Sequence, residues 1–162
     1  MQKKLWIFSG IFVLIDQIIK ILVSNYITYN TDIEIISNFF YLTNVHNDGA
    51  AFSAFAGNLI FLIIMTIISL CIVYYFFVRD KELKGLNLFI VSMLIGGIIG
   101  NFIDRIIHGY VIDYLRFIIF KYQYPIFNFA DTCIVISVML LLIISFKEDL
   151  WKNTKSRKKV EE

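Results

Sequence analysis

Four aspartates stand out in this chain because each lies in or beside a strongly apolar stretch: Asp16, Asp104, Asp113 and Asp131. Acidic side chains within a membrane are costly, and those that occur there usually face a protein interior and mark a functional site. Two carboxylates held close together in a low dielectric cannot both ionise easily, so one of them keeps a proton. An ionised aspartate beside a protonated one is suited to hydrolysis of a peptide bond by water, without a covalent intermediate or a cofactor.

The apolar stretches that must position these aspartates are long enough to cross a bilayer core, which needs about 20 residues. They cover residues 5–23, 59–78, 86–103 and 126–146. The whole chain has 162 residues, is 59% hydrophobic and is 17% charged, whereas a soluble domain is about one quarter charged. We therefore expect an all-α polytopic membrane protein with four transmembrane helices in a single membrane-embedded domain, followed by a basic tail over residues 147–162. The net charge of +2 gives no indication of a nucleic-acid partner.

Lysine and arginine indicate the orientation, because they are enriched in cytoplasmic segments. The N-terminus, the loop between the second and third spans, and the tail are basic, whereas residues 24–58 contain no Lys or Arg. We therefore expect both termini in the cytoplasm. The first span carries Asp16 and Lys20 and lacks a small-residue cleavage site, so we interpret it as a retained helix rather than a signal peptide. The outer segment 31–58 is expected to form a small platform with short strands.

With this orientation, all four aspartates lie toward the outer face. Asp16 lies roughly 10 Å below the outer end of its span and Asp131 roughly 8 Å into the fourth, at about 1.5 Å per residue. Asp104 follows the third span and Asp113 lies in the outer loop after it. Asn101 is spaced to share a helical face with Asp104, and Asn128 likewise with Asp131. The spacing therefore predicts a shared polar pocket near the outer surface.

The spacing leaves several roles open. Asp16 and Lys20 are an i, i+4 pair, so a structural ion pair is as good an explanation for Asp16 as direct catalysis. Asp104 at a helix end either braces the outer loop or is the second catalytic acid. Gly96 and Gly100 form a GxxxG pattern, which more often indicates close helix packing than chemistry.

Other kinds of protein fit less well. A small proton-coupled transporter or channel subunit would have carboxylates distributed through the membrane's depth, and here they lie on one side. A thiol- or metal-dependent hydrolase is a second alternative. A CxxC motif would indicate a structural zinc site and an HExxH motif a zinc peptidase, and neither motif occurs in the sequence. Cys71 and Cys133 are expected to be small buried hydrophobes, and His46 and His108 lie in outer loops. We expect neither a metal site nor a cofactor.

Five motifs occur along the chain in a fixed order, and together they resemble the bacterial lipoprotein signal peptidases (signal peptidase II), which are membrane aspartyl peptidases. The resemblance covers nearly the whole chain. The motifs are Asp16-Gln17-x-x-Lys20, Asn47-x-Gly49-Ala50-Ala51-Phe52, Gly97-x-x-Gly100-Asn101-x-x-Asp104-Arg105, Gly109-x-Val111-x-Asp113-Tyr114 and Phe127-Asn128-x-Ala130-Asp131.

The resemblance implies an endopeptidase of the bacterial cytoplasmic membrane, with its active site toward the extracytoplasmic side. The family removes the signal peptide from diacylglyceryl-modified prolipoproteins by cutting before the lipidated cysteine. It works as a monomer without a cofactor, and cyclic peptides of the globomycin type inhibit it. The resemblance, and not the spacing, selects Asp113 and Asp131 as the catalytic pair. The resemblance also implies that eight further residues line or support the site: Asn47, Gly49, Asn101, Arg105, Asn128, Asp16, Lys20 and Asp104.

Overall fold

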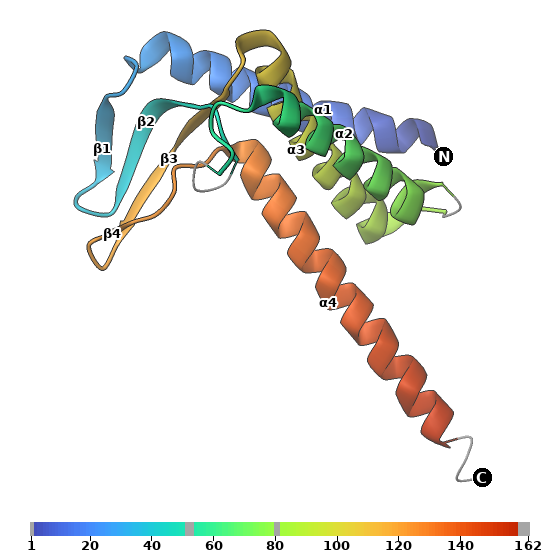
Figure 1. Cartoon of the computed structure of the whole chain (residues 1–162). Helices are drawn as coiled ribbons and strands as arrows, with labels where there is room; N and C mark the ends of the chain where they lie inside the picture. The colour runs from blue at the N-terminus through green and yellow to red at the C-terminus, as the bar shows by residue number, and fades with distance from the viewer. Residues whose placement is uncertain (1, 51–53, 80–81, 159–162) are drawn as a thin grey trace.

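The computed structural model describes residues 2–50, 54–79 and 82–158, and the side chains of these as far as residue 147. Four of its helices are long and apolar enough to cross a membrane, as predicted. Figure 1 shows their arrangement. The helices are α1 (Gln2–Tyr26), α2 (Leu59–Val73) with its π-helical continuation η2 (Tyr74–Val78), α3 (Gly85–His108) and α4 (Phe129–Lys158).

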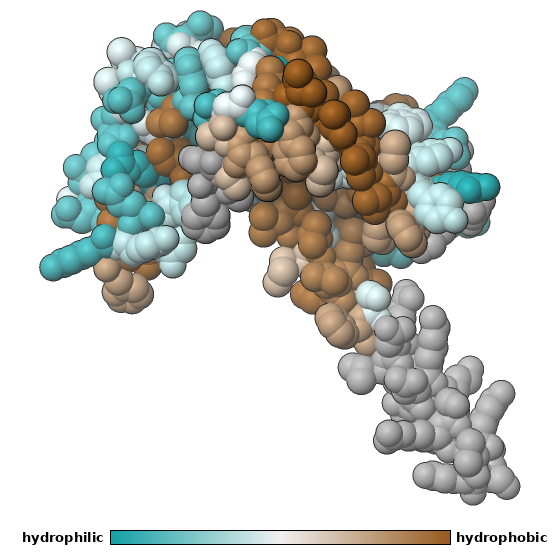
Figure 2. All heavy atoms as spheres, in the orientation of Figure 1, coloured by the Kyte–Doolittle hydropathy of each residue, from teal (hydrophilic) through white to brown (hydrophobic). Residues whose placement is uncertain are grey.

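Helix α3 lies at the centre of the bundle. In its most apolar stretch 67% of the residues are buried, against 22% or less in the other three helices. Close approach is possible because glycines of α3 are contact points. Of the two predicted small-residue positions, Gly96 faces Phe12 on α1 and Gly100 faces Asp16 on α1. Gly97, which the GxxxG pattern does not include, faces the carbonyl oxygen of Ala130 on α4. The outer faces of the helices are apolar and exposed, and Figure 2 shows this hydrophobic surface over the bundle. Such a surface is typical of contact with lipid.

A four-stranded antiparallel sheet lies at the end of the bundle away from the N-terminus (Figure 1). Strands were expected only between the first two spans, and the segment after the third span supplies two more. Residues 111–119 contain Val, Ile, Tyr and Phe, a composition typical of strands. In the register of the two central strands, Asp113 is opposite Val45 and Asn47 is opposite Val111. The strands are β1 (Asp32–Ile36), β2 (Phe40–Asn47), β3 (Val111–Ile119) and β4 (Tyr122–Gln123).

Helix α4 begins three residues later than the predicted fourth span. Pro125 has no amide hydrogen to donate, and Phe127 pairs with Leu115 of β3 through its main chain. The helix starts at Phe129, which places Asp131 in its first turn beside β3. At its other end α4 continues to Lys158 through the first part of the basic tail, whose last residues, 159–162, lie outside the described part of the chain.

Candidate active site

Asp113 lies on β3 with only 2% of its surface exposed. Its two carboxylate oxygens accept hydrogen bonds from two amide side chains, Asn47 Nδ2 at 2.8 Å and Asn128 Nδ2 at 2.7 Å. Burial, followed by the negative charge of Asp131, raises the pKa of Asp113 to about 7. The carboxyl group can therefore hold a proton close to neutral pH.

Asp131 is held by two other amide groups, one of which also belongs to Asn128. Its carboxylate accepts from Asn101 Nδ2 at 2.7 Å and from the main-chain amide of Asn128 at 3.1 Å. Asn128 Nδ2 also donates to Asn101 Oδ1 at 3.1 Å. Asn128 therefore contacts both aspartates directly, one through its side chain and the other through its backbone.

Both aspartates lie in the wall of a groove of about 1110 Å³. Its polar part consists mainly of Asn47, Asn101, Arg105, Asp113 and Asp131, while the remainder is lined mostly by apolar side chains of α2, α3 and α4. Two carboxyl groups thus lie beside a groove that suits an apolar chain.

Asp16, Lys20 and Asp104 form a buried ion cluster that does not line this groove. Lys20 Nζ lies 2.8 Å from Asp16 Oδ2 and 2.9 Å from Asp104 Oδ2. It also donates to Asn101 Oδ1 at 2.9 Å. Because that oxygen accepts from Lys20, the NH2 group of Asn101 is directed to Asp131. The geometry gives Asp16 and Asp104 a structural ion-pair arrangement around Lys20.

Asp104 has a further contact that bears on β3. Its Oδ2 accepts at 3.1 Å from the main-chain amide of Ile112, the residue directly before Asp113 in the chain. Asp104 therefore joins the ion cluster to the strand that carries Asp113.

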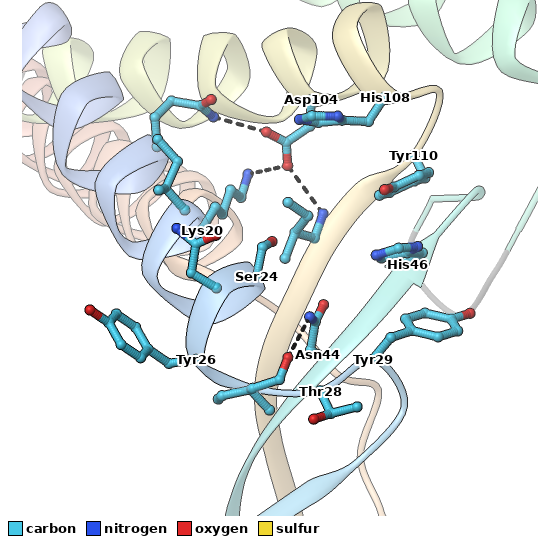
Figure 3. A pocket seen from close by; sticks show the side chains of 15 residues that line it. Lys20, Ser24, Tyr26, Thr28, Tyr29, Asn44, His46, Asp104, His108 and Tyr110 are labelled. Carbon is cyan, nitrogen blue, oxygen red and sulfur yellow. Dashed lines mark hydrogen bonds and ion pairs between the residues drawn. The ribbon is translucent and has the colours of Figure 1, made fainter.

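A second cavity lies beside this cluster, and Figure 3 shows Lys20 reaching Asp104 in its wall. This cavity, of about 610 Å³, lies between the C-terminal ends of α1 and α3 and the sheet. His46 stacks on Tyr110 there, with ring centroids 3.8 Å apart. Burial and nearby His108 lower the pKa of His46.

Arg105 and Gly49 meet at the edge of the groove. Arg105 Nη2 donates to the carbonyl oxygen of Gly49 at 3.1 Å, and the amide of Gly49 donates to Asn47 Oδ1 at 2.9 Å. Within the described residues, Arg105 Nε is buried without a hydrogen-bond partner. The next part of the motif, residues 51–53, lies outside the described part of the chain.

Two further residues join this network although the sequence predicted no role for them. Gln17 Nε2 donates to Asp104 Oδ1 at 2.9 Å and to the carbonyl oxygen of Gly100 at 3.2 Å. The hydroxyl of Tyr114 accepts from the amide of Phe129 at 3.0 Å. Both residues lie inside the quoted motifs, each directly after an aspartate, and that adjacency was the available signal.

The cysteines differ from each other. Cys133 is buried, as predicted, with its Cβ facing Gly97, whereas Cys71 is exposed. The prediction for Cys71 was wrong because the apolar surface of α2 faces outward instead of into the bundle. Neither cysteine lines the groove.

Comparison with known proteins gives one consistent family. The model of the family described as signal peptidase (SPase) II matches residues 8–147. Lipoprotein signal peptidases of Staphylococcus aureus strains JH9 and Newman are 36% identical over 163 residues, covering 98% of this chain and all of theirs.

Two solved structures are also similar, both described as bacterial membrane enzyme structures determined by the in meso method. The one at 2.3 Å resolution has a TM-score of 0.80 and 34% identity, over 88% of this chain and 87% of its own. The one at 1.9 Å resolution has a TM-score of 0.76 and 35% identity, over 87% of this chain and 91% of its own. The resemblance inferred from the motifs is confirmed, and none of these proteins supports the transporter alternative: the chain belongs to the signal peptidase II family.

Proposed function

We propose that this protein removes the signal peptide from diacylglyceryl-modified prolipoproteins, cutting before the lipidated cysteine with Asp113 and Asp131 as its catalytic residues. The observation that carries the proposal is the bridging of the two aspartates by Asn128 beside a largely apolar groove. The names of the curated relatives support the same class of substrate.

The chemistry follows from two carboxylates that share one proton. The ionised carboxylate takes a proton from water, whose oxygen then bonds to the scissile carbonyl carbon, while the protonated carboxyl donates a hydrogen bond to the carbonyl oxygen. The tetrahedral species collapses as the C–N bond breaks, and the leaving amine takes the proton that the ionised carboxylate had removed from water, which regenerates that carboxylate. Because the pKa of Asp113 is raised to about 7, we assign the shared proton to Asp113 and the ionised role to Asp131.

The groove supports a lipid-modified substrate. Its apolar walls suit the hydrophobic segment of a signal peptide and the acyl chains of a diacylglyceryl group, because contact with these walls keeps both apolar groups out of water near the active site. Arg105 lines the groove beside Asp113 and Asp131, and we propose that its guanidinium group binds a carbonyl oxygen of the substrate's main chain. Asn47 and Asn101 would hold the two carboxylates in place from either side.

The protein's setting is part of the proposal. The distribution of Lys and Arg supports cytoplasmic termini in the bacterial cytoplasmic membrane, with the sheet and active site on the extracytoplasmic side. We propose one peptidase domain acting as a monomer, with residues 147–162 as a cytoplasmic tail. A globomycin-type cyclic peptide would occupy the groove and inhibit cleavage.

The test is cleavage of a prolipoprotein by the full-length protein purified in mild detergent. Precursor carrying the diacylglyceryl group should be cut before its modified cysteine, and unmodified precursor should not. Globomycin should abolish the cleavage. Equal cutting of both precursors would contradict the proposed substrate class, and no cutting of either by folded protein would contradict the peptidase itself.

A further inference from the structure

The hydroxyl of Tyr114 connects the two chain segments that carry the aspartates. Tyr114 follows Asp113 on β3 and is 4% exposed. Its hydroxyl oxygen accepts a hydrogen bond from the main-chain amide of Phe129 at 3.0 Å. Phe129 is the first residue of α4, two positions before Asp131. One side chain thus joins the strand of Asp113 to the helix of Asp131.

This contact supplements a main-chain junction at the same place. The carbonyl oxygen of Phe127 accepts from the amides of Tyr114 at 3.1 Å and Leu115 at 2.8 Å. The amide of Phe127 donates to the carbonyl oxygen of Leu115 at 3.1 Å. These bonds fix the approach to α4, and the hydroxyl of Tyr114 then fixes the first residue of the helix itself.

A helix start needs such a partner, because its first amide groups have no acceptor within the helix. Without the hydroxyl, the amide of Phe129 would lack this acceptor and the first turn of α4 would be less firmly held against β3. The ring of Tyr114 has a separate packing role, since it lies in a hydrophobic cluster with Val23, Ile27 and Ile112. A Phe side chain preserves that packing, so the hydroxyl can be tested alone.

We propose that Tyr114 is a positioning residue: its hydroxyl holds the first turn of α4 so that Asp131 stays aligned with Asp113. This inference rests on the proposed function. A hydrogen bond of this kind affects the rate and not substrate affinity, because it fixes the relative position of reacting groups. Burial raises the pKa of the Tyr114 hydroxyl above its ordinary value, so the hydroxyl stays protonated at the neutral pH at which cleavage is measured.

The experiment compares Tyr114→Phe with wild type and with Tyr110→Phe, a matched change in the second cavity and outside the groove. For Tyr114→Phe we expect kcat on diacylglyceryl prolipoprotein to fall about tenfold, with KM unchanged, because the reacting groups are less well aligned. The melting temperature in detergent should be close to that of wild type. Amide hydrogen exchange should become faster in the peptide that contains Phe129 and stay unchanged elsewhere. Tyr110→Phe should resemble wild type in every measurement.

Three results would overturn the role of Tyr114: an unchanged kcat, unchanged exchange at Phe129, or an equal loss of activity in Tyr110→Phe. Asp113→Asn is measured in the same series, so that the two proposals can fail separately. If Asp113→Asn cleaves at the wild-type rate, the catalytic pair fails and the positioning role fails with it. If Asp113→Asn is inactive and Tyr114→Phe is as fast as wild type, the role of Tyr114 alone fails.

Discussion

Asn128 and Asp131 cap the start of α4 for each other. The amide of Asn128 donates to Asp131 Oδ2 at 3.1 Å, and the amide of Asp131 donates to Asn128 Oδ1 at 2.9 Å. This reciprocal pair is a capping box, which satisfies two main-chain donors at once. It also fixes the side-chain amide of Asn128, whose Nδ2 donates to Asp113. The same contacts that start the helix therefore hold both carboxylates of the proposed catalytic pair.

The pH dependence of cleavage should reflect Asp113. Its pKa is raised from 3.8 to about 7, so its carboxyl group is protonated below about pH 7 and ionised above it. The proposed mechanism needs this proton, and we expect kcat/KM to fall as pH rises through about 7. Asn47 lowers the pKa of Asp113 by donating a hydrogen bond. In Asn47→Ala the alkaline fall should therefore move to higher pH, in addition to any loss of rate.

A pH–rate profile checks this prediction. Asn25→Ala is the matched control, because Asn25 lies at the end of α1 beside the second cavity and does not line the groove. Its profile should overlay that of wild type. An alkaline fall that stays in place, or moves to lower pH, in Asn47→Ala would show that Asp113 does not control it.

Lys20 should be essential for stability because it neutralises two buried carboxylates. Lys20→Met leaves Asp16 and Asp104 buried without their cation, and removing one partner from such a cluster costs about 3 to 5 kcal/mol. The triple variant Lys20→Met, Asp16→Asn, Asp104→Asn removes every charge of this cluster, so it should recover part of the lost free energy of unfolding. Thermal unfolding in detergent compares the two. Equal melting temperatures for Lys20→Met and wild type would contradict the buried ion cluster.

Gly100 should not accept a larger side chain. A Cβ atom there would lie 2.5 Å from Asp16 Oδ2. That oxygen cannot move away easily, because Asp16 is bound to Lys20 and to the amide of Ala130. Gly100→Ala should therefore destabilise the protein by about 1 to 3 kcal/mol. Gly10→Ala is the control, since a Cβ there meets nothing within 4 Å. The Gly100 prediction fails if both variants unfold at the same temperature as wild type.

The sequence predicted the parts of the site that depend on local spacing. The pair of Asp16 and Lys20 at i, i+4 is present at 2.8 Å. Asn128 and Asp131 share the start of one helix, as their spacing indicated. The four spans were also predicted, because long apolar runs in a chain of this composition have few alternatives.

Spacing could not choose between Asp104 and Asp113, because the choice depends on long-range pairing. The register of β2 on β3 brings Asn47 and Asp113 within 2.8 Å, although they are 66 residues apart. Likewise the second carboxylate at Lys20 comes from a different helix, 2.9 Å away. No local periodicity encodes either contact. The resemblance supplied the choice of Asp113, and the assignment of catalysis to Asp113 and Asp131 remains a prediction.

The most direct test of that assignment is the cleavage rate of diacylglyceryl prolipoprotein by Asp113→Asn, Asp131→Asn and Asp32→Asn. Asp32 is the control carboxylate, because it pairs with Arg116 on the sheet and does not line the groove. We predict that both active-site variants fold and lose at least about a thousandfold in rate, while Asp32→Asn cleaves like wild type. Cleavage at the wild-type rate by either Asp113→Asn or Asp131→Asn would contradict the catalytic pair.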